Sequence, residues 1–264
     1  KPEKDLPLED TQKIWREILD KHIFVLCMTP MARQITIRTL AGFNEDWQVN
    51  AIYLTKLLER MKDDQPRLAR KLSNPVTWEK EGEKLKFDAV VGNPPYDVMD
   101  GVAQASSKPL YQYFIQGSKA LNPKYISYIL PTRCYAVGKG LDEFREEMLN
   151  DEHISVLHDC LTPEKIFPNT NIRGGVCWFL WDKNYNNKYD LVRVVTHSNN
   201  KIVGDTMRTL KVDGLDIFIR NPLSINIINK VFSDTNTQSL MDSVSPRKPF
   251  GLEGFFNKTD RFKD

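Results

Sequence analysis

The sequence lacks the features that would assign it to several common protein classes. Its four cysteines, Cys27, Cys134, Cys160 and Cys177, form no Cys-x-x-Cys pair, and this spacing argues against a structural zinc site and a disulfide framework. No apolar run approaches the roughly 18 residues of a membrane-spanning helix. The first residues, KPEKDLPLEDTQK, are polar and charged, unlike a signal peptide. We therefore expect reduced thiols, a cytoplasmic location, no membrane partner and no metal.

The sequence also has little excess charge of either sign. Lysine and arginine number 37 and aspartate and glutamate 35, so the formal net charge is +2 and the pI about 8.3. Composition neither implies nor excludes nucleic acid as a partner, because a local basic groove is averaged away in the total. The 264 residues, 41% of them hydrophobic, suffice for one sizeable core. The chain does not begin with Met, and we expect a fragment of a longer polypeptide.

Short apolar runs alternate with segments of helical period along most of the chain. Strands are predicted at 23–28, 86–92, 124–131, 154–160, 174–184 and 189–197, and helices at 8–22, 30–41, 109–121, 140–151 and 222–232. The segment 44–72 also has a helical period, which Pro66 interrupts. This alternation predicts a Rossmann-like α/β fold with a mostly parallel sheet and helices on both faces. The runs 174–184 and 189–197 are predicted to pair as an antiparallel edge of that sheet.

The alternating pattern weakens after His197. We expect a loop there, then the helix 222–232, and from Ser243 a tail rich in proline, glycine, basic and aromatic residues. Two regions are therefore predicted: a core at 1–200, and a C-terminal extension or linker at 201–264.

The stretch FDAVVGNPPYDVMDG, residues 87–101, combines a buried strand with an unusual ending. Pro94 pushes Asn93 toward an extended backbone, and Pro94 and Pro95 each fix φ near about −65°. Neither proline offers an N–H, so the Asn93 side chain and the carbonyls of Asn93 and Pro94 are neutral acceptors beside the flat ring of Tyr96. Such a rigid loop suits a planar group that carries an NH2. The loop also follows the carboxyl end of a predicted strand, and in open α/β sheets ligands bind beyond the carboxyl ends of the strands.

This motif resembles the catalytic motif of S-adenosylmethionine-dependent DNA methyltransferases that modify adenine N6. Within that group it is similar to the large methylase subunits and fused methylase–nucleases of bacterial restriction–modification systems, over about residues 14–195. The resemblance implies a methyltransferase sheet, with Asn93, Pro94, Pro95 and Tyr96 as the catalytic residues. It also implies double-stranded DNA with a flipped adenine as the substrate.

The resemblance further implies where the cofactor S-adenosylmethionine binds. The family's helix after the catalytic loop lines the adenine pocket, and Leu110 and Phe114 take that place here. At the end of the strand 23–28, Cys27 stands where the family usually has an acid for the ribose hydroxyls, and Met28 and Pro30 could pack against the adenine ring. A thiol is a poor acceptor. The family's glycine-rich loop should precede this strand, and residues 1–13 contain no glycine.

A later segment, EKIFPNTNIRGGVCWFLWDK, is similar to the family's segment in which a loop leads into an antiparallel strand. By that resemblance Phe167 is a second aromatic face for the base, while Asn171 and Arg173 meet base or phosphate. The alternative is that Phe167 is a core residue and Arg173 a solvated charge, just as Leu110 and Phe114 could be plain helix core.

The leading hypothesis is therefore methyl transfer to adenine N6 in DNA, as the modification part of a restriction–modification system. Partners implied by the resemblance are a specificity or nuclease subunit or domain, and the region from Ser243 is a candidate start of a target-recognition domain. Two alternatives stay open. Asn-Pro-Pro-Tyr also occurs in enzymes that methylate RNA bases or protein glutamine. The chain could also be a non-catalytic DNA-binding or assembly fragment without a complete cofactor site, since it has Cys27 and no glycine loop.

Overall fold

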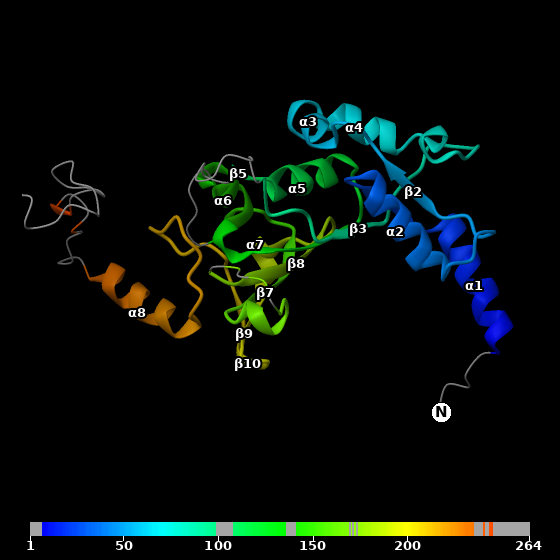
Figure 1. The fold of residues 1–264 in the computed structure, drawn as a ribbon. Coiled ribbons are helices and arrows are strands. Elements are labelled where there is room, and N and C mark those ends of the chain that lie inside the picture. Colours follow the sequence, from blue (N-terminus) through cyan, green and yellow to red (C-terminus); the bar gives the residue numbers. More distant parts are fainter. Residues whose placement is uncertain are drawn as a thin grey trace, which may run out of the picture. The chain divides into compact units, whose positions relative to one another are not determined.

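A computed structural model of the chain describes residues 7–98, 108–135, 141–168, 170, 172, 174–234, 240, 243 and 244. The chain divides into two compact units, Lys1–Arg220 and Asn221–Asp264. Figure 1 shows the ribbon of both units.

The helices and strands of the first unit alternate along much of the chain. In chain order they are α1 (Leu8–Lys21), β1 (Phe24–Cys27), α2 (Pro30–Ala41), β2 (Asn50–Tyr53), α3 (Leu57–Asp63), α4 (Gln65–Leu72), η1 (Pro75–Trp78), β3 (Ala89–Gly92), β4 (Asp97–Val98), β5 (Lys108–Pro109), α5 (Tyr111–Ala120), β6 (Tyr125–Pro131), η2 (Thr132–Cys134), α6 (Asp142–Leu149), β7 (Ile154–Cys160), η3 (Pro163–Lys165), β8 (Val176–Asp182), α7 (Asn187–Asp190), β9 (Val192–Ser198) and β10 (Lys201–Arg208). The α/β class predicted from the sequence is confirmed.

Local signals set the ends of α2. The Thr29 hydroxyl accepts a hydrogen bond from the Ala32 N–H at 3.0 Å, and Pro30 occupies the first turn. At the other end Gly42 adopts φ 60°, a left-handed conformation that glycine tolerates without strain. The sequence therefore predicted this helix with its correct bounds.

The prediction for residues 44–72 was partly wrong, because this segment contains a strand. β2 pairs in parallel with β1, from Phe24 opposite Asn50 to Cys27 opposite Tyr53. Helices α3 and α4 follow, and Asp64 alone separates them. The strand depends on a distant contact: the Asn50 amide, 3% exposed, donates to the carbonyls of Leu19, Asp20 and Ile23 at 2.8–3.0 Å. No helical-period pattern could reveal that contact.

The main sheet has six strands in the order β10-β9-β7-β8-β6-β3. Strands β3 and β6 pair in parallel, as do β7 and β9, while β8 is antiparallel to both β6 and β7, and β10 is antiparallel to β9. The sheet is therefore mixed, not mostly parallel. The predicted pairing of 174–184 with 189–197 was also wrong, because β8 lies between β6 and β7 and the antiparallel edge strand is β10.

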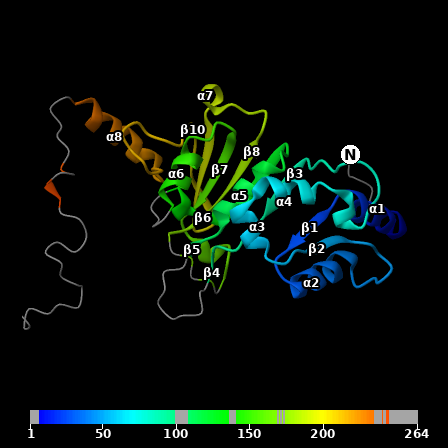
Figure 2. The ribbon, with the colours of Figure 1, turned by 90° about the horizontal axis from the view of Figure 1, so that it is seen from above.

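The sheet packs its larger core on one face. Figures 1 and 2 show α5 and α6 over the same face of the sheet, and Tyr111, Ile115, Phe144 and Met148 of these helices belong to the core cluster. The strand residues of that cluster include Ile126, Leu130, Leu157 and Phe179. On the opposite face, side chains such as Ile129, Trp178 and His158 are only half-buried. Within the described residues, the helical cover of this sheet is thus seen on one face.

The core extends beyond residue 200. Strand β10 pairs with β9 from Lys201 to Arg208, so the segment predicted as a loop belongs to the main sheet. The first compact unit ends at Arg220, 20 residues after the boundary predicted from the sequence. The second unit contains α8 (Pro222–Ser233), as predicted, and the Asn221 side chain caps it by accepting from the Leu223 N–H. The tail from residue 245 lies outside the described residues.

Two general findings complete the description of the fold. Among the helices of the described residues, none has the length and apolarity needed to cross a membrane. All four cysteines are free and buried.

The Asn50 contacts give a first prediction. We expect Asn50→Ala to lower the free energy of unfolding by about 2 kcal/mol, because three carbonyls in a buried region lose their donor. Chemical denaturation of both proteins measures the difference. Asn44, an exposed turn residue, is the matched control, and Asn44→Ala should change the value by less than about 0.5 kcal/mol. Equal effects of the two substitutions would contradict a structural role for Asn50.

Candidate active site

The loop Asn93–Tyr96 begins at the carboxyl end of β3. The register of β3 with β6 runs from Ala89 opposite Tyr125 to Gly92 opposite Tyr128. Because β3, β6, β7 and β9 all run in the same direction, their carboxyl ends lie at one edge of the sheet. This edge is where α/β proteins bind ligands, so the topology brings the loop to the expected place.

Gly92 is required by a close contact with Tyr128. A Cβ atom at residue 92 would lie 2.9 Å from Cε1 of the Tyr128 ring. That ring is fixed, since the Tyr128 hydroxyl and the Ser118 hydroxyl are hydrogen-bonded at 2.8 Å and the Ser118 hydroxyl also donates to the Phe114 carbonyl at 2.7 Å. The residue before Asn93 therefore rests against a ring that α5 holds in place.

The four residues of the motif differ in exposure. Asn93 is exposed, Pro94 is buried, and Pro95 and Tyr96 are half-buried. The Tyr96 carbonyl accepts a hydrogen bond from the Leu110 N–H at 3.2 Å, which ties the loop to the start of α5. The buried proline and this hydrogen bond hold the loop, while the Asn93 amide remains accessible.

The Tyr96 ring packs against the main core, and its hydroxyl makes no hydrogen bond with the described residues. Burial, with a smaller contribution from the Cys177 thiol, raises the pKa of the Tyr96 phenol to about 12. The phenol therefore stays neutral at physiological pH. A neutral ring is available for packing or stacking, and no charge forms beside the Asn93 amide.

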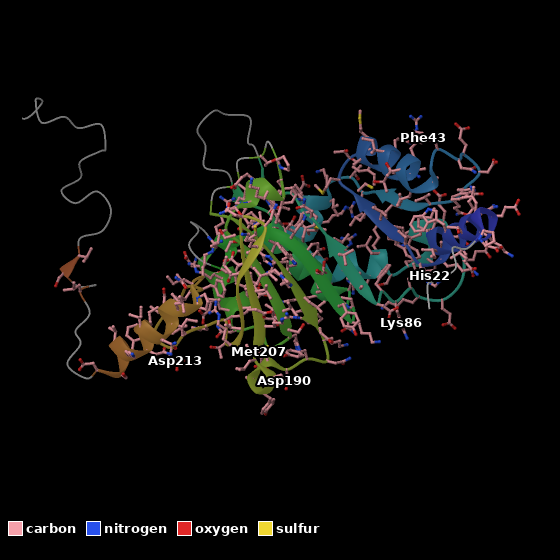
Figure 3. All side chains as sticks on the ribbon, turned by 90° about the horizontal axis from the view of Figure 1, so that it is seen from below. His22, Phe43, Lys86, Asp190, Met207 and Asp213 are labelled. Atoms are coloured by element: carbon pink, nitrogen blue, oxygen red, sulfur yellow. The ribbon has the colours of Figure 1, made fainter. Side chains whose placement is uncertain are left out.

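A cavity of about 530 Å³ lies beside the loop, between β1 and β3. Asn93, Pro94 and Pro95 line it together with Met28 and Phe114. Its floor is the smaller core, in which the rings of Phe24 and Trp78 lie 5.1 Å apart and the rings of Phe24 and Phe87 5.6 Å apart. His22, labelled in Figure 3, lies at the end of α1 and also lines the cavity. Among the described lining residues there is no Asp or Glu.

The predicted cofactor residues divide between those that line this cavity and those that do not. Met28 and Phe114 line it, whereas Cys27, Pro30 and Leu110 are not among its lining residues. Cys27 is 5% exposed, and its thiol lies 3.7 Å from the Thr36 hydroxyl, so it faces α2. Leu110 is 2% exposed and caps α5. The alternative reading of Leu110 as a core residue fits this position.

The predicted base-contacting residues lie after β7. Phe167 is half-buried, and its neighbour Ile166 shares a cavity of about 390 Å³ with Gly92 and Tyr128. This segment therefore lies close to the start of the Asn93 loop. Asn171 and Arg173 lie outside the described residues.

Sequence reasoning missed a polar cluster at the same edge of the sheet. Asp159 is 0% exposed and accepts hydrogen bonds from Thr132 and Arg220. The sequence offered one signal for this cluster, an acid inside the apolar run ISVLHDC. A buried carboxylate needs a hydrogen-bonding or charged partner, so the acid indicated that such a partner lies nearby. Nothing in the sequence pointed to Arg220 as that partner. In the described ranges, no three His, Cys, Asp or Glu side chains gather as metal ligands.

Comparison with known families identifies the chain. Residues 21–167, more than half of its length, match the model of the Eco57I restriction-modification methylase family. The chain therefore belongs to this family. The matched range covers the strand before α2, the Asn-Pro-Pro-Tyr loop and Phe167, which agrees with the resemblance found in the sequence.

The chain spans less than half the length of three proteins to which it is similar. An uncharacterized adenine-specific methylase of Mycoplasma pneumoniae is 29% identical over 107 residues, covering 39% of this chain and 25% of the relative. The methyltransferase subunit of a type I restriction-modification system from Streptococcus thermophilus is 16% identical, with a TM-score of 0.41, covering 79% of this chain and 41% of that one. The M protein of the type I restriction enzyme EcoKI is 17% identical, with a TM-score of 0.42, covering 69% and 36%.

The contact between Gly92 and Tyr128 gives a second prediction. We expect Gly92→Ala to destabilise the fold by about 1–3 kcal/mol, because the added methyl group must displace a fixed ring. Gly117 in α5 is the control, since a Cβ there meets nothing within 4 Å. Gly117→Ala should leave stability unchanged or raise it by up to about 1 kcal/mol. Thermal and chemical denaturation compare the two, and a neutral Gly92→Ala would show that the loop is not held against Tyr128.

Proposed function

We propose that this chain carries the base-binding part of an S-adenosylmethionine-dependent methyltransferase that modifies adenine N6 in DNA, within a restriction–modification system. The observation that carries the proposal is the Asn-Pro-Pro-Tyr loop, which follows β3 and lines a cavity together with Met28 and Phe114. Membership of a restriction-modification methylase family supports the reaction class.

The loop's chemistry matches an exocyclic amino group. Because adenine N6 is unreachable inside a duplex, the base must first leave the stack. The Asn93 side-chain oxygen and the Pro94 carbonyl are then two neutral acceptors for the two N6 hydrogens. Tyr96, which is neutral, supplies a ring on which the base stacks. Holding both hydrogens in this way directs the nitrogen lone pair away from the base plane, and no ionised base is required beforehand.

The cavity fits one part of S-adenosylmethionine better than the other. Its apolar and aromatic lining, including Met28 and Phe114, suits the adenine ring of the cofactor. The ribose hydroxyls and the ammonium group need acceptors, and no Asp or Glu of the described residues lines the cavity. When bound, the cofactor supplies an electrophilic methyl group. The residues of this chain would hold its adenine ring and position the amino nitrogen of the base.

The remaining roles follow from this chemistry. Lysine and arginine contacts to phosphates would hold the DNA with a salt-dependent affinity. Phe167, and with it Asn171 and Arg173, would contact the flipped base or its neighbouring phosphates. The first unit, Lys1–Arg220, would carry catalysis, and the chain after it would lead toward a target-recognition domain or a specificity or nuclease subunit, in the cytoplasm.

Substitution of the loop tests the proposed role directly. We expect Asn93→Ala to lower the kcat of methyl transfer to DNA by about 10²- to 10³-fold, because one of two fixed acceptors is lost. Asn93 is exposed, so the fold should be unaffected. Incorporation of labelled methyl groups by the whole protein is the measurement.

Tyr96 provides the matched comparison for that experiment. Tyr96→Phe keeps the ring and should retain activity, whereas Tyr96→Ala should lose it because stacking is removed. Normal methylation by Asn93→Ala would refute the assignment. Methylation of RNA or of protein glutamine, and not of DNA, in a substrate panel would favour the related enzymes that share the motif.

Calorimetry distinguishes an enzyme from a non-catalytic fragment. We expect this chain to bind S-adenosylmethionine with a Kd above about 0.1 mM, because the cavity offers apolar surface but no carboxylate. Phe114→Ala should abolish that binding, while Phe43→Ala, an exposed residue outside the cavity, should not alter it. Binding of S-adenosylmethionine with a micromolar Kd would contradict the view that this chain lacks acceptors for the polar part of the cofactor. Absence of binding in every longer form of the protein would favour a scaffold that binds DNA without catalysis.

A further inference from the structure

Asp159 is the centre of a polar cluster that the proposed reaction does not use directly. Its carboxylate, 0% exposed, accepts from the Thr132 hydroxyl at 2.9 Å and from Nε and Nη2 of Arg220, each at 2.7 Å. The two Arg220 bonds reach different carboxylate oxygens, so the pair is bidentate. Such a pair fixes both distance and orientation, which a single-point cation cannot do.

Arg220 also contacts the other end of the segment 161–175. Its Nη1 donates to the Gly174 carbonyl at 2.5 Å. Gly175, with φ 97°, approaches the end of β7 so closely that a Cβ would overlap the Cys160 carbonyl oxygen and Nη2 of Arg220. The Gly175 carbonyl in turn accepts from the Thr132 N–H at 3.0 Å. One guanidinium therefore joins Asp159, which precedes this segment, to Gly174 near its end.

The same segment lies against the start of the Asn93 loop. Ile166 and Gly92 line one cavity, and the amides of Ile166 and Phe167 both donate to the Pro163 carbonyl, at 2.9 and 2.8 Å. These two hydrogen bonds tie Phe167 to the turn that follows β7, so its position depends on how that turn is held.

The chain around Arg220 is itself anchored. The Phe218 N–H donates to the Tyr135 carbonyl at 2.9 Å, and Arg208 donates to the Ile219 carbonyl at 2.6 Å and lies over the Phe218 ring at 4.5 Å. Burial lowers the pKa of the Arg208 guanidinium to about 10, so it stays charged at neutral pH. Arg220 is thus held at a defined point, as the last residue before the second unit begins at Asn221.

We propose that Arg220 is a positioning residue that ties Gly174 to Asp159 and thereby places residues 161–168, which include Phe167, beside the loop proposed to bind the base. The effect of this on catalysis rests on the proposed function, whereas its effect on the segment does not. The pair would act through geometry, because a Lys at this position keeps the charge but lacks the planar, fixed set of nitrogens with which Arg220 reaches both oxygens of Asp159 and the Gly174 carbonyl.

The test compares Arg220→Lys with Arg193→Lys in the full chain. Arg193 of β9 also forms a bidentate pair, with Asp205 of β10 at 2.7 and 3.0 Å. Its side chain, however, is 56% exposed. Hydrogen–deuterium exchange is followed across 161–175 and across β6 and β7. We expect Arg220→Lys to speed exchange at Ile166 and Phe167 by about tenfold or more, with β6 and β7 unchanged, because the segment opens locally. Arg193→Lys should change neither region.

The kinetic consequence is measured on the whole protein. We expect Arg220→Lys to lower the kcat of methyl transfer by about ten- to a hundredfold, since a misplaced reactant reduces rate more than binding, with the KM for S-adenosylmethionine unchanged. Unchanged exchange in 161–175 would overturn the proposal. Faster exchange that extends equally to β6 and β7 would also overturn it, because it would mean a general loss of stability. If the wild-type protein methylates no substrate, the proposed function fails, and the exchange result still decides the role of Arg220.

Discussion

The parallel pairing of β3 with β6 is the constraint on which the site depends. Four residue pairs, Ala89–Gly92 with Tyr125–Tyr128, determine where β3 ends and therefore where the Asn93 amide lies. A shift of one residue would reverse the faces of the strand, and it would bring a residue with a side chain against the Tyr128 ring in place of Gly92. Gly92, which has no side chain, and the fixed Tyr128 ring thus hold the Asn-Pro-Pro-Tyr loop in a single register.

Phe114 connects this strand pair to the rest of the first unit. It packs against both core clusters, and it lines the cavity between β1 and β3. On the cavity side, neither β1 nor β3 pairs with another strand of the described residues, and Val91 remains 73% exposed. Parallel strands are ordinarily covered on both faces and paired on both edges. The Asn93 loop therefore rests on a well-packed sheet, whereas the cavity proposed for the cofactor rests on two strand edges and an apolar floor.

The sequence predicted what depends on near neighbours. The caps of α2 need only a few adjacent residues, and this helix was found with its correct bounds. The strand before the Asn-Pro-Pro-Tyr loop was predicted as buried over 86–92, which was wrong, because β3 spans only Ala89–Gly92 and is mostly exposed at the edge of the sheet. The position of β8 between β6 and β7 is a choice among strand pairings that local pattern does not encode, and proximity in the sequence wrongly favoured pairing with β9. Edge strand β10 alternates between half-buried and exposed positions from Gly204 to Arg208, but the half-buried residues are Gly204, Thr206 and Arg208. No apolar alternation therefore marks it in the sequence. Asp159 stood out as a charge in an apolar strand, but its partner lies 61 residues away.

That partner explains why a buried ion pair is used at a position where apolar residues could pack. Burying a carboxylate is costly, and a well-packed apolar group in its place is often equally stable or more so. An apolar contact, however, does not define orientation. Asp159 accepts from three donors, and Arg220 donates to two segments at once, so the ends of β6 and β7 and the start of β8 are held at one point. We therefore interpret the pair as a device for geometry more than for stability. For the base contact proposed for Phe167, a fixed position matters more than additional buried area.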